Sequence, residues 1–239
     1  MPSKFETQLE HAKLDAMKEL AYGASHEINN PLANIAARAQ TLMRDEALPD
    51  RRLALEAIHQ QAMRAHEMIS DLMLFARPPA LDVQKVDLSK LLSTVADRYK
   101  SECARRDIRL NLTLPSTPLE IPGDEQQLEV ALRAVCSNAI EAVGTDGSIG
   151  VAVSSDSQAD DRVIIQITDT GVGMSDEVRQ HLFDPFYSGR EAGRGLGFGM
   201  SKCWRIVTDH GGSINVSSSL GEGTTISLQL PADFLSDGE

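Results

Sequence analysis

The chain has 239 residues, which is long enough for two domains of ordinary size, each with its own core. A formal net charge of −12 argues against nucleic acid or an anionic membrane as a general partner, because such a field repels phosphates. No apolar run approaches the roughly 20 residues that span a bilayer, and the N-terminus has no signal-peptide pattern. Three widely spaced cysteines fit neither a disulfide framework nor a zinc site, so we expect reduced thiols.

Apolar and small residues recur every three or four positions near the start of the chain and predict an amphipathic helix over about residues 5–44. This helix contains the stretch His26-Glu27-Ile28-Asn29-Asn30-Pro31-Leu32. His26 offers a nucleophilic imidazole, Glu27 a carboxylate beside it, and Asn30 an amide one turn later on the same exposed face. Pro31 is expected to kink or loosen the helix. Taken alone, the stretch is weak evidence for a catalytic site, since most single histidines on helices are ordinary surface residues.

A second long helix is predicted from Pro49 to Phe75, ending at Arg77-Pro78-Pro79. Two long helices joined by a short connection form an antiparallel hairpin. A single hairpin buries only one face of each helix, so pairing with a second copy into a four-helix bundle is its natural completion. We therefore predict a homodimer formed through the hairpin.

The pattern changes after the paired prolines, so we place one domain at residues 1–79 and a second at 80–239. The second domain mixes helices and strands, which predicts an α/β sandwich with a mixed sheet covered by helices, and an α+β class for the whole chain. Helices are expected over residues 87–106, 124–143, 175–182 and 198–210, and strands over 108–114, 148–153, 162–168, 213–218 and 224–230. Residues 115–123 are expected to be loop and 154–161 a polar turn.

Two glycine clusters lie in this second domain. Asp169-Thr170-Gly171-Val172-Gly173 follows a predicted strand, and Gly193-Arg194-Gly195-Leu196-Gly197 leads into a predicted helix. Exposed amides before a helix form an anion site, and a buried Asp169 could accept a hydrogen bond from an adenine amino group. Asn138 lies inside a predicted helix, where an amide side chain could bind a hard cation. Each feature also has an ordinary explanation, a flexible loop or a surface amide.

Together with Leu182-Phe183-Asp184-Pro185-Phe186-Tyr187 and Gly221-Glu222-Gly223-Thr224, these motifs resemble the ATP-binding domain of bacterial sensor histidine kinases in content and order. The stretch from His26 to Leu32 is similar to the phosphoacceptor box of that family. The resemblance covers about residues 10–232. It implies autophosphorylation with ATP, transfer of the phosphoryl group to an aspartate of a response regulator receiver domain, and in some members dephosphorylation of that regulator.

The resemblance also implies roles for the acceptor box. His26 would attack the γ-phosphate of ATP through Nε2, and Glu27 would orient the ring or take its proton. Asn30 matches a position that holds a water for dephosphorylating the regulator.

In the second domain, the resemblance implies that Asn138 binds Mg²⁺ and that Asp169 recognises adenine. The remaining implied nucleotide-binding residues are Gly171, Gly173, Gly195, Leu196, Gly197 and Thr224, the last beside Gly223. The chain also departs from the family pattern. Ala134 stands where many members have asparagine, and Ser188-Gly189-Arg190 stands where many have Thr-Thr-Lys, so Arg190 or Arg194 could replace that lysine.

Two other functions use the same nucleotide site: an ATPase like the gyrase and Hsp90 relatives, and a nucleotide-binding dimeric scaffold. His26 on a hairpin helix argues against the first, and the presence of Glu27, Asn138 and Asp169 together argues against the second. We expect no nucleic-acid partner and no membrane contact by this chain. It would then be either a cytoplasmic protein or the cytoplasmic part of a larger, membrane-bound sensor.

Overall fold

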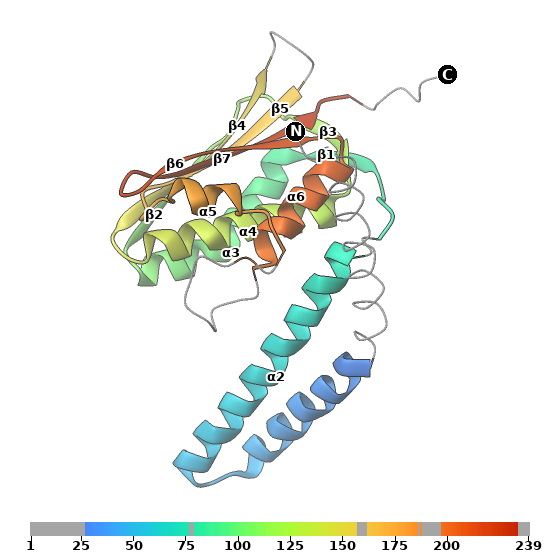
Figure 1. The fold of residues 1–239 in the computed structure, drawn as a ribbon, viewed down its shortest axis with the longest axis vertical. Helices are drawn as coiled ribbons and strands as arrows, with labels where there is room; N and C mark the ends of the chain where they lie inside the picture. Colours follow the sequence, from blue (N-terminus) through green and yellow to red (C-terminus); the bar gives the residue numbers. More distant parts are fainter. Residues whose placement is uncertain (1–26, 77–78, 157–161, 186, 188–196, 234–239) are drawn as a thin grey trace. The chain divides into compact units, whose positions relative to one another are not determined.

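The computed structural model describes residues 27–76, 79–156, 162–185, 187 and 197–233, with the backbone alone at 67 and 71–76. The chain divides between Pro79 and Ala80 into two compact units, which are described separately. Figure 1 shows a helical first unit and a second unit in which helices lie against a sheet. Within the described residues, every helix is too short or too polar to cross a membrane.

The first unit is an antiparallel helical hairpin. Residues 27–45 form its first helix, and α2 (Pro49–Ala76) forms the second. The amide of Leu48 donates to Glu46 Oε1 at 2.9 Å and closes the connection between them. The first helix continues through Pro31. The part of this helix that was predicted before residue 27, including His26, lies outside the described residues.

The two helices of the hairpin pack along a seam of less exposed residues spaced by three and four. The seam consists of Asn29, Leu32, Ala36, Ala39 and Met43 on the first helix and of Leu55, His59, Ala62, His66 and Ile69 on α2. His59 Nδ1–H donates across the seam to the carbonyl oxygen of Ala36 at 3.0 Å. Small residues occupy the centre of the seam, and this hydrogen bond shows which residues of the two helices lie opposite each other.

One part of the predicted apolar stripe lies outside the seam. Ile28, Ile35 and Leu42 are 40%, 46% and 60% exposed, whereas Ala39 is buried. The three exposed residues are spaced by seven and form a second apolar row on the outer side of the helix. We call Ile28, Ile35 and Leu42 the outer row.

The second unit is an α/β sandwich, as predicted. In chain order it contains β1 (Gln84–Asp87), α3 (Leu88–Arg105), β2 (Ile108–Thr113), β3 (Glu120–Gly123), α4 (Glu125–Val143), β4 (Gly147–Asp156), β5 (Arg162–Asp169), α5 (Asp176–Gln180), α6 (Gly199–Asp209), β6 (Ser213–Ser219) and β7 (Gly223–Pro231). The strands of the main sheet have the order β2-β4-β5-β7-β6. Only β2 and β4 among these neighbours are parallel, so the sheet is mixed.

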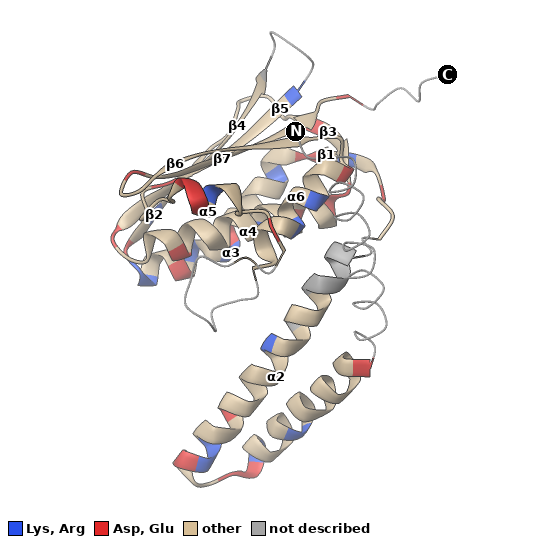
Figure 2. Ribbon diagram, in the orientation of Figure 1, with Lys and Arg blue, Asp and Glu red and all other residues tan. Residues whose placement is uncertain are grey.

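Helices α3, α4 and α6 lie together on one face of the main sheet (Figure 1). The alternation along β5 explains this layering, because Val163, Ile165 and Ile167 are buried and Gln166 is exposed. Strands β6 and β7 contain no charged residue and are entirely tan in Figure 2, whereas the helices carry charges of both signs.

The prediction of a loop over residues 115–123 was wrong, because β3 lies within it and pairs with the unpredicted strand β1. These strands are too short for a clear alternation, and Pro122 argues against a strand in the sequence. Val86 and Ile121 face each other in the pair and are both buried. The predicted turn over 154–161 was also too long, since residues 154–156 extend β4 alongside β5.

Two aspartates begin the main helices of the second unit. Asp87 Oδ1 accepts from the amides of Ser89 and Lys90 at the start of α3, at 2.9 and 3.1 Å. Asp124 caps α4 by accepting from the amide of Gln127 at 3.0 Å, and it also accepts from Gln127 Nε2 and the amide of Asp82, both at 3.1 Å. Burial alone would raise the pKa of Asp124, but these hydrogen bonds lower it overall.

Asp124→Ala is therefore expected to lower the free energy of unfolding more than Asp87→Ala. Loss of an N-cap costs about 1 kcal/mol, and a buried donor without a partner costs about 1–3 kcal/mol more. Urea unfolding of both variants measures the difference. Because its pKa is lowered, the ionised Asp124 stabilises the fold at pH values above the ordinary aspartate range. The loss of unfolding free energy caused by Asp124→Ala should therefore shrink as the pH falls through that range. Equal losses for both variants would contradict this account of Asp124.

Candidate functional site

Asp169 ends β5 and is 5% exposed. Its Oδ1 accepts from the amide of Gly171 at 2.8 Å, and its carboxylate also accepts from the amide of Thr224, the residue opposite it on β7. Burial raises the pKa of Asp169, and these two hydrogen bonds oppose the shift only in part. The residue is thus a buried acceptor held in a fixed direction by backbone donors.

Close packing shapes the turn after Asp169. A side chain at Gly171 would place its Cβ 2.5 Å from the carbonyl carbon of Ala142 on α4. Gly173 has a φ of +64°, and a Cβ there would lie 1.9 Å from the carbonyl oxygen of Ser219. Both glycines are required by geometry, and the turn is held between α4 and the end of β6.

Helix α4 brings Asn138 toward this turn. The amide of Val172 donates to the carbonyl oxygen of Ala142 at 3.2 Å, so the turn rests on the C-terminal part of α4. Asn138 precedes Ala142 by four residues and lies on the same face of the helix, where it is half-buried. Asn138 and Asp169 therefore border the same region, from a helix and from a strand.

Ala134, the departure from the family pattern, lies one turn before Asn138 on α4. A Cβ built on Gly199, the first residue of α6, would be 4.0 Å from the Cβ of Ala134. The small residues at these two positions let the start of α6 approach α4 closely. The position at which many family members have asparagine is therefore occupied here by a small residue in contact with α6.

Thr224 is 5% exposed and reaches the site from β7. Its hydroxyl forms a hydrogen bond of 2.9 Å with Ser218 Oγ. Ser218 also donates to the carbonyl oxygen of Gly223 and accepts from the amide of Met174, each at 2.9 Å. Ser218 thereby ties the turn after β5 to the β6–β7 hairpin, a role that no feature of the sequence indicates.

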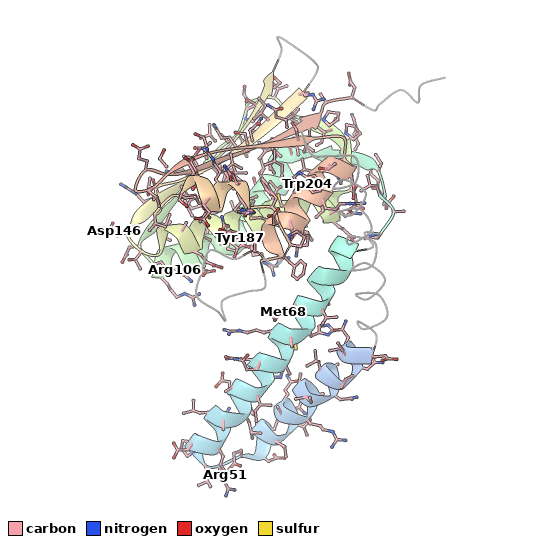
Figure 3. All side chains as sticks on the ribbon, viewed as in Figure 1. Arg51, Met68, Arg106, Asp146, Tyr187 and Trp204 are labelled. Carbon is pink, nitrogen blue, oxygen red and sulfur yellow. The ribbon has the colours of Figure 1, made fainter. Side chains whose placement is uncertain are left out.

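The segment after α5 closes onto the second glycine cluster. A Cβ on Gly197 would lie 2.1 Å from the carbonyl oxygen of Tyr187, so these two residues meet although they are separated in the chain. Tyr187 lies close to the start of α6 (Figure 3). His181 Nδ1 bonds Asp184 Oδ2 at 2.6 Å, and its ring lies 5.2 Å from that of Tyr187. The predicted site residues Arg190, Arg194, Gly195 and Leu196 lie outside the described residues.

The acceptor box belongs to the first unit. Glu27 and Asn30 are exposed on the first helix, whereas Asn29 faces the seam. His26 is outside the described residues. The structure therefore brings Asp169, Gly171, Gly173 and Thr224 together in the second unit, with Asn138 one turn before Ala142, which supports this turn. It places Glu27 and Asn30 on an accessible surface of the first unit.

Family comparisons match both units. Residues 123–233 match the model described as "Histidine kinase-, DNA gyrase B-, and HSP90-like ATPase". Residues 16–80 match the "His Kinase A (phospho-acceptor) domain".

Curated relatives are similar to this chain over nearly its whole length. The sensor histidine kinase ZraS of Escherichia coli K12 is 32% identical over 223 residues, which cover 93% of this chain and 47% of ZraS. Sporulation kinase C of Bacillus subtilis is 30% identical over 223 residues, which cover 93% of this chain and 50% of that protein. The chain thus spans about half the length of these relatives.

Solved structures have the same fold. Full-length ShkA in complex with AMPPNP gives a TM-score of 0.79 at 24% identity, covering 89% of this chain and 45% of ShkA. The histidine kinase ThkA in complex with the response regulator protein TrrA gives 0.67 at 20% identity, covering 93% of this chain and 64% of that chain. The two matched domains and the curated relatives establish that this chain belongs to the bacterial sensor histidine kinase family and carries its two-domain catalytic core.

Proposed function

We propose that this chain is an ATP-dependent protein-histidine kinase that phosphorylates its own His26 and passes the phosphoryl group to an aspartate of a response regulator. The observation that carries the proposal is the buried carboxylate of Asp169, oriented by the amides of Gly171 and Thr224. Burying a carboxylate costs free energy, and the two backbone donors leave Asp169 with acceptor capacity that a ligand donor can use.

The residues around Asp169 suit a nucleotide. The carboxylate can accept from the adenine amino group, and Gly171 and Gly173 keep side chains out of the space beside it. Asn138 Oδ1 would hold Mg²⁺, which would supply positive charge beside the phosphates. The local amides and this cation let a chain with a net charge of −12 hold an anion. Gly195, Leu196, Gly197 and an arginine at 190 or 194 would complete the phosphate end.

The acceptor box supplies the nucleophile. An ordinary histidine is largely neutral near pH 7, so its Nε2 can attack phosphorus without a strong base. Glu27 then needs only to orient the ring or receive its proton. Because phosphoryl transfer depends on positioning and charge neutralisation, a single nucleophile with few other catalytic groups is sufficient. The reaction takes place in the cytoplasm, where ATP is available.

A response regulator receiver domain is the partner that accepts the phosphoryl group. The ThkA structure contains a response regulator, which supports a partner of this class. Asn30 is exposed one turn after His26 and could hold the water that dephosphorylates the regulator. An ATPase that drives a conformational change, or a nucleotide-binding scaffold, would leave the acceptor box without a role.

The first test is incubation of the purified chain with γ-³²P-ATP and Mg²⁺. We expect acid-labile, alkali-stable label on the wild type and none on His26→Gln or Asn138→Ala. His26→Gln should still bind a fluorescent ATP analogue with unchanged affinity, because the nucleotide site lies in the other unit. Turnover of ATP without any label on the protein favours the ATPase, and binding without turnover favours the scaffold.

Asp169→Asn separates binding from stability. The raised pKa of Asp169 means that the folded state binds this proton more tightly than the unfolded state, so protonation stabilises the fold. This stabilisation is fully present below the ordinary aspartate pKa and is lost as the pH rises through the raised value. At pH 7 the thermal midpoint of Asp169→Asn should therefore equal or exceed that of the wild type. The difference between the two midpoints should narrow as the pH falls. ATP affinity should fall about 10- to 100-fold, because a charged hydrogen bond is lost.

Calorimetric titration with a non-hydrolysable ATP analogue and a thermal melt measure both effects. Asp97→Asn, at an exposed position on α3, is the matched control and should change neither. Unchanged affinity in Asp169→Asn would remove Asp169 from adenine recognition.

We also propose that the hairpin forms a homodimer. Ile28, Ile35 and Leu42, the outer row, leave an apolar stripe uncovered, and the exposed Leu53, Ile58 and Met63 add apolar surface on α2. A second copy of the hairpin covers such surface in a four-helix bundle. Charge placed in the outer row should therefore prevent association.

Ile35→Glu is expected to change the sedimentation of the chain from dimer to monomer, because an unpaired carboxylate cannot be buried in the bundle. Gln40→Glu adds the same charge at another exposed position of this helix and should leave the dimer intact. A dimer that survives Ile35→Glu would place the interface elsewhere.

A further inference from the structure

Two polar side chains occupy inward positions of the hairpin seam, Asn29 on the first helix and His66 on α2. Asn29 Oδ1 and His66 Nδ1 are buried, and neither has a hydrogen-bond partner among the described residues. A buried polar atom without a partner costs free energy, so two such atoms in one small unit require an explanation.

The register of the hairpin places these two residues at the same level. His59 Nδ1 meets the carbonyl oxygen of Ala36 at 3.0 Å. Asn29 precedes Ala36 by seven residues, and His66 follows His59 by seven. Because the helices are antiparallel, two turns along each of them lead in the same direction in space.

The two atoms are also chemically complementary. The amide oxygen of Asn29 accepts hydrogen bonds, and His66 Nδ1 carries a proton in one neutral tautomer and in the charged form. They form no direct hydrogen bond with each other, so one water between them in the seam would give both atoms a partner at once.

We propose that His66 Nδ1–H donates to a water that in turn donates to Asn29 Oδ1, and that His66 is thereby a positioning residue for the acceptor box. Asn29 follows His26 by three residues, which is less than one helical turn. Ala36, Ala39 and Ala62 offer few shape constraints against sliding or rotation at the centre of the seam. A polar contact beside the acceptor box therefore sets the axial position and the rotation of the first helix relative to α2, where the proposed nucleophile must be aligned.

The effect on phosphorylation rests on the proposed kinase function, whereas the contact itself does not. The test uses the whole chain with His66→Leu, Asn29→Leu and the double variant. His59→Leu is the matched control, because it replaces the other seam histidine of α2 two turns farther from the acceptor box. We expect His66→Leu to slow autophosphorylation at saturating ATP at least about tenfold with an unchanged KM for ATP. His59→Leu should slow it less than threefold.

Asn29→Leu should resemble His66→Leu, and the double variant should be no slower than either, because it leaves no polar atom unpaired. His66→Gln keeps an N–H donor and should retain most of the rate. Three results would each overturn the proposal: additive losses in the double variant, His66→Leu no slower than His59→Leu, or His66→Gln as slow as His66→Leu.

A second readout does not need kinase activity. The shifts in urea midpoint of the single and double variants form a double-mutant cycle for the contact. Non-additive shifts support the Asn29–His66 contact even if the wild type carries no label, an outcome in which only the kinase function fails. Additive shifts overturn the contact whatever the activity.

Discussion

The buried carboxylate of Asp169 is the constraint on which the second unit depends. Burial raises the pKa of this group, so the ionised form of Asp169 costs the fold stability. Its two backbone donors come from the next turn and from the neighbouring strand β7, which means that strand pairing and turn shape must both be correct. A residue that is costly to bury and so firmly oriented is typical of a binding site.

Helix α4 connects this site to the core. Its N-terminus is capped by Asp124, its apolar face packs beneath the sheet, and Ala142 near its end supports the turn after Asp169. Asn138 lies between these points. Because one helix carries the cap, the packing face and Asn138, the proposed cation ligand, a shift at either end moves Asn138 relative to Asp169.

The sequence predicted those features that are encoded locally. The helix starts expected at residues 87 and 124, the periodicity of the helices and the glycine turn after β5 all depend on neighbouring residues. Features formed by distant residues were missed. Ser218 links two turns, and the amide of Asp124 donates to Nε2 of the buried His210 at 2.9 Å across 86 residues of chain. No pattern in the sequence marks serine or histidine for such contacts.

The hairpin illustrates a different limit. Its seam and its outer row both repeat about every seven residues, so apolar periodicity alone could not tell which residues face α2 and which remain for another partner. The hydrogen bond from His59 to Ala36 shows that the row containing Ala36 faces α2. Since alanines fill the centre of the seam, the hairpin buries little apolar surface by itself, and the proposed dimer would gain stability by covering the outer row. In the proposed dimer, association and the alignment of the acceptor box are linked, because the same helix carries the seam, the outer row and the acceptor-box residues Glu27 and Asn30.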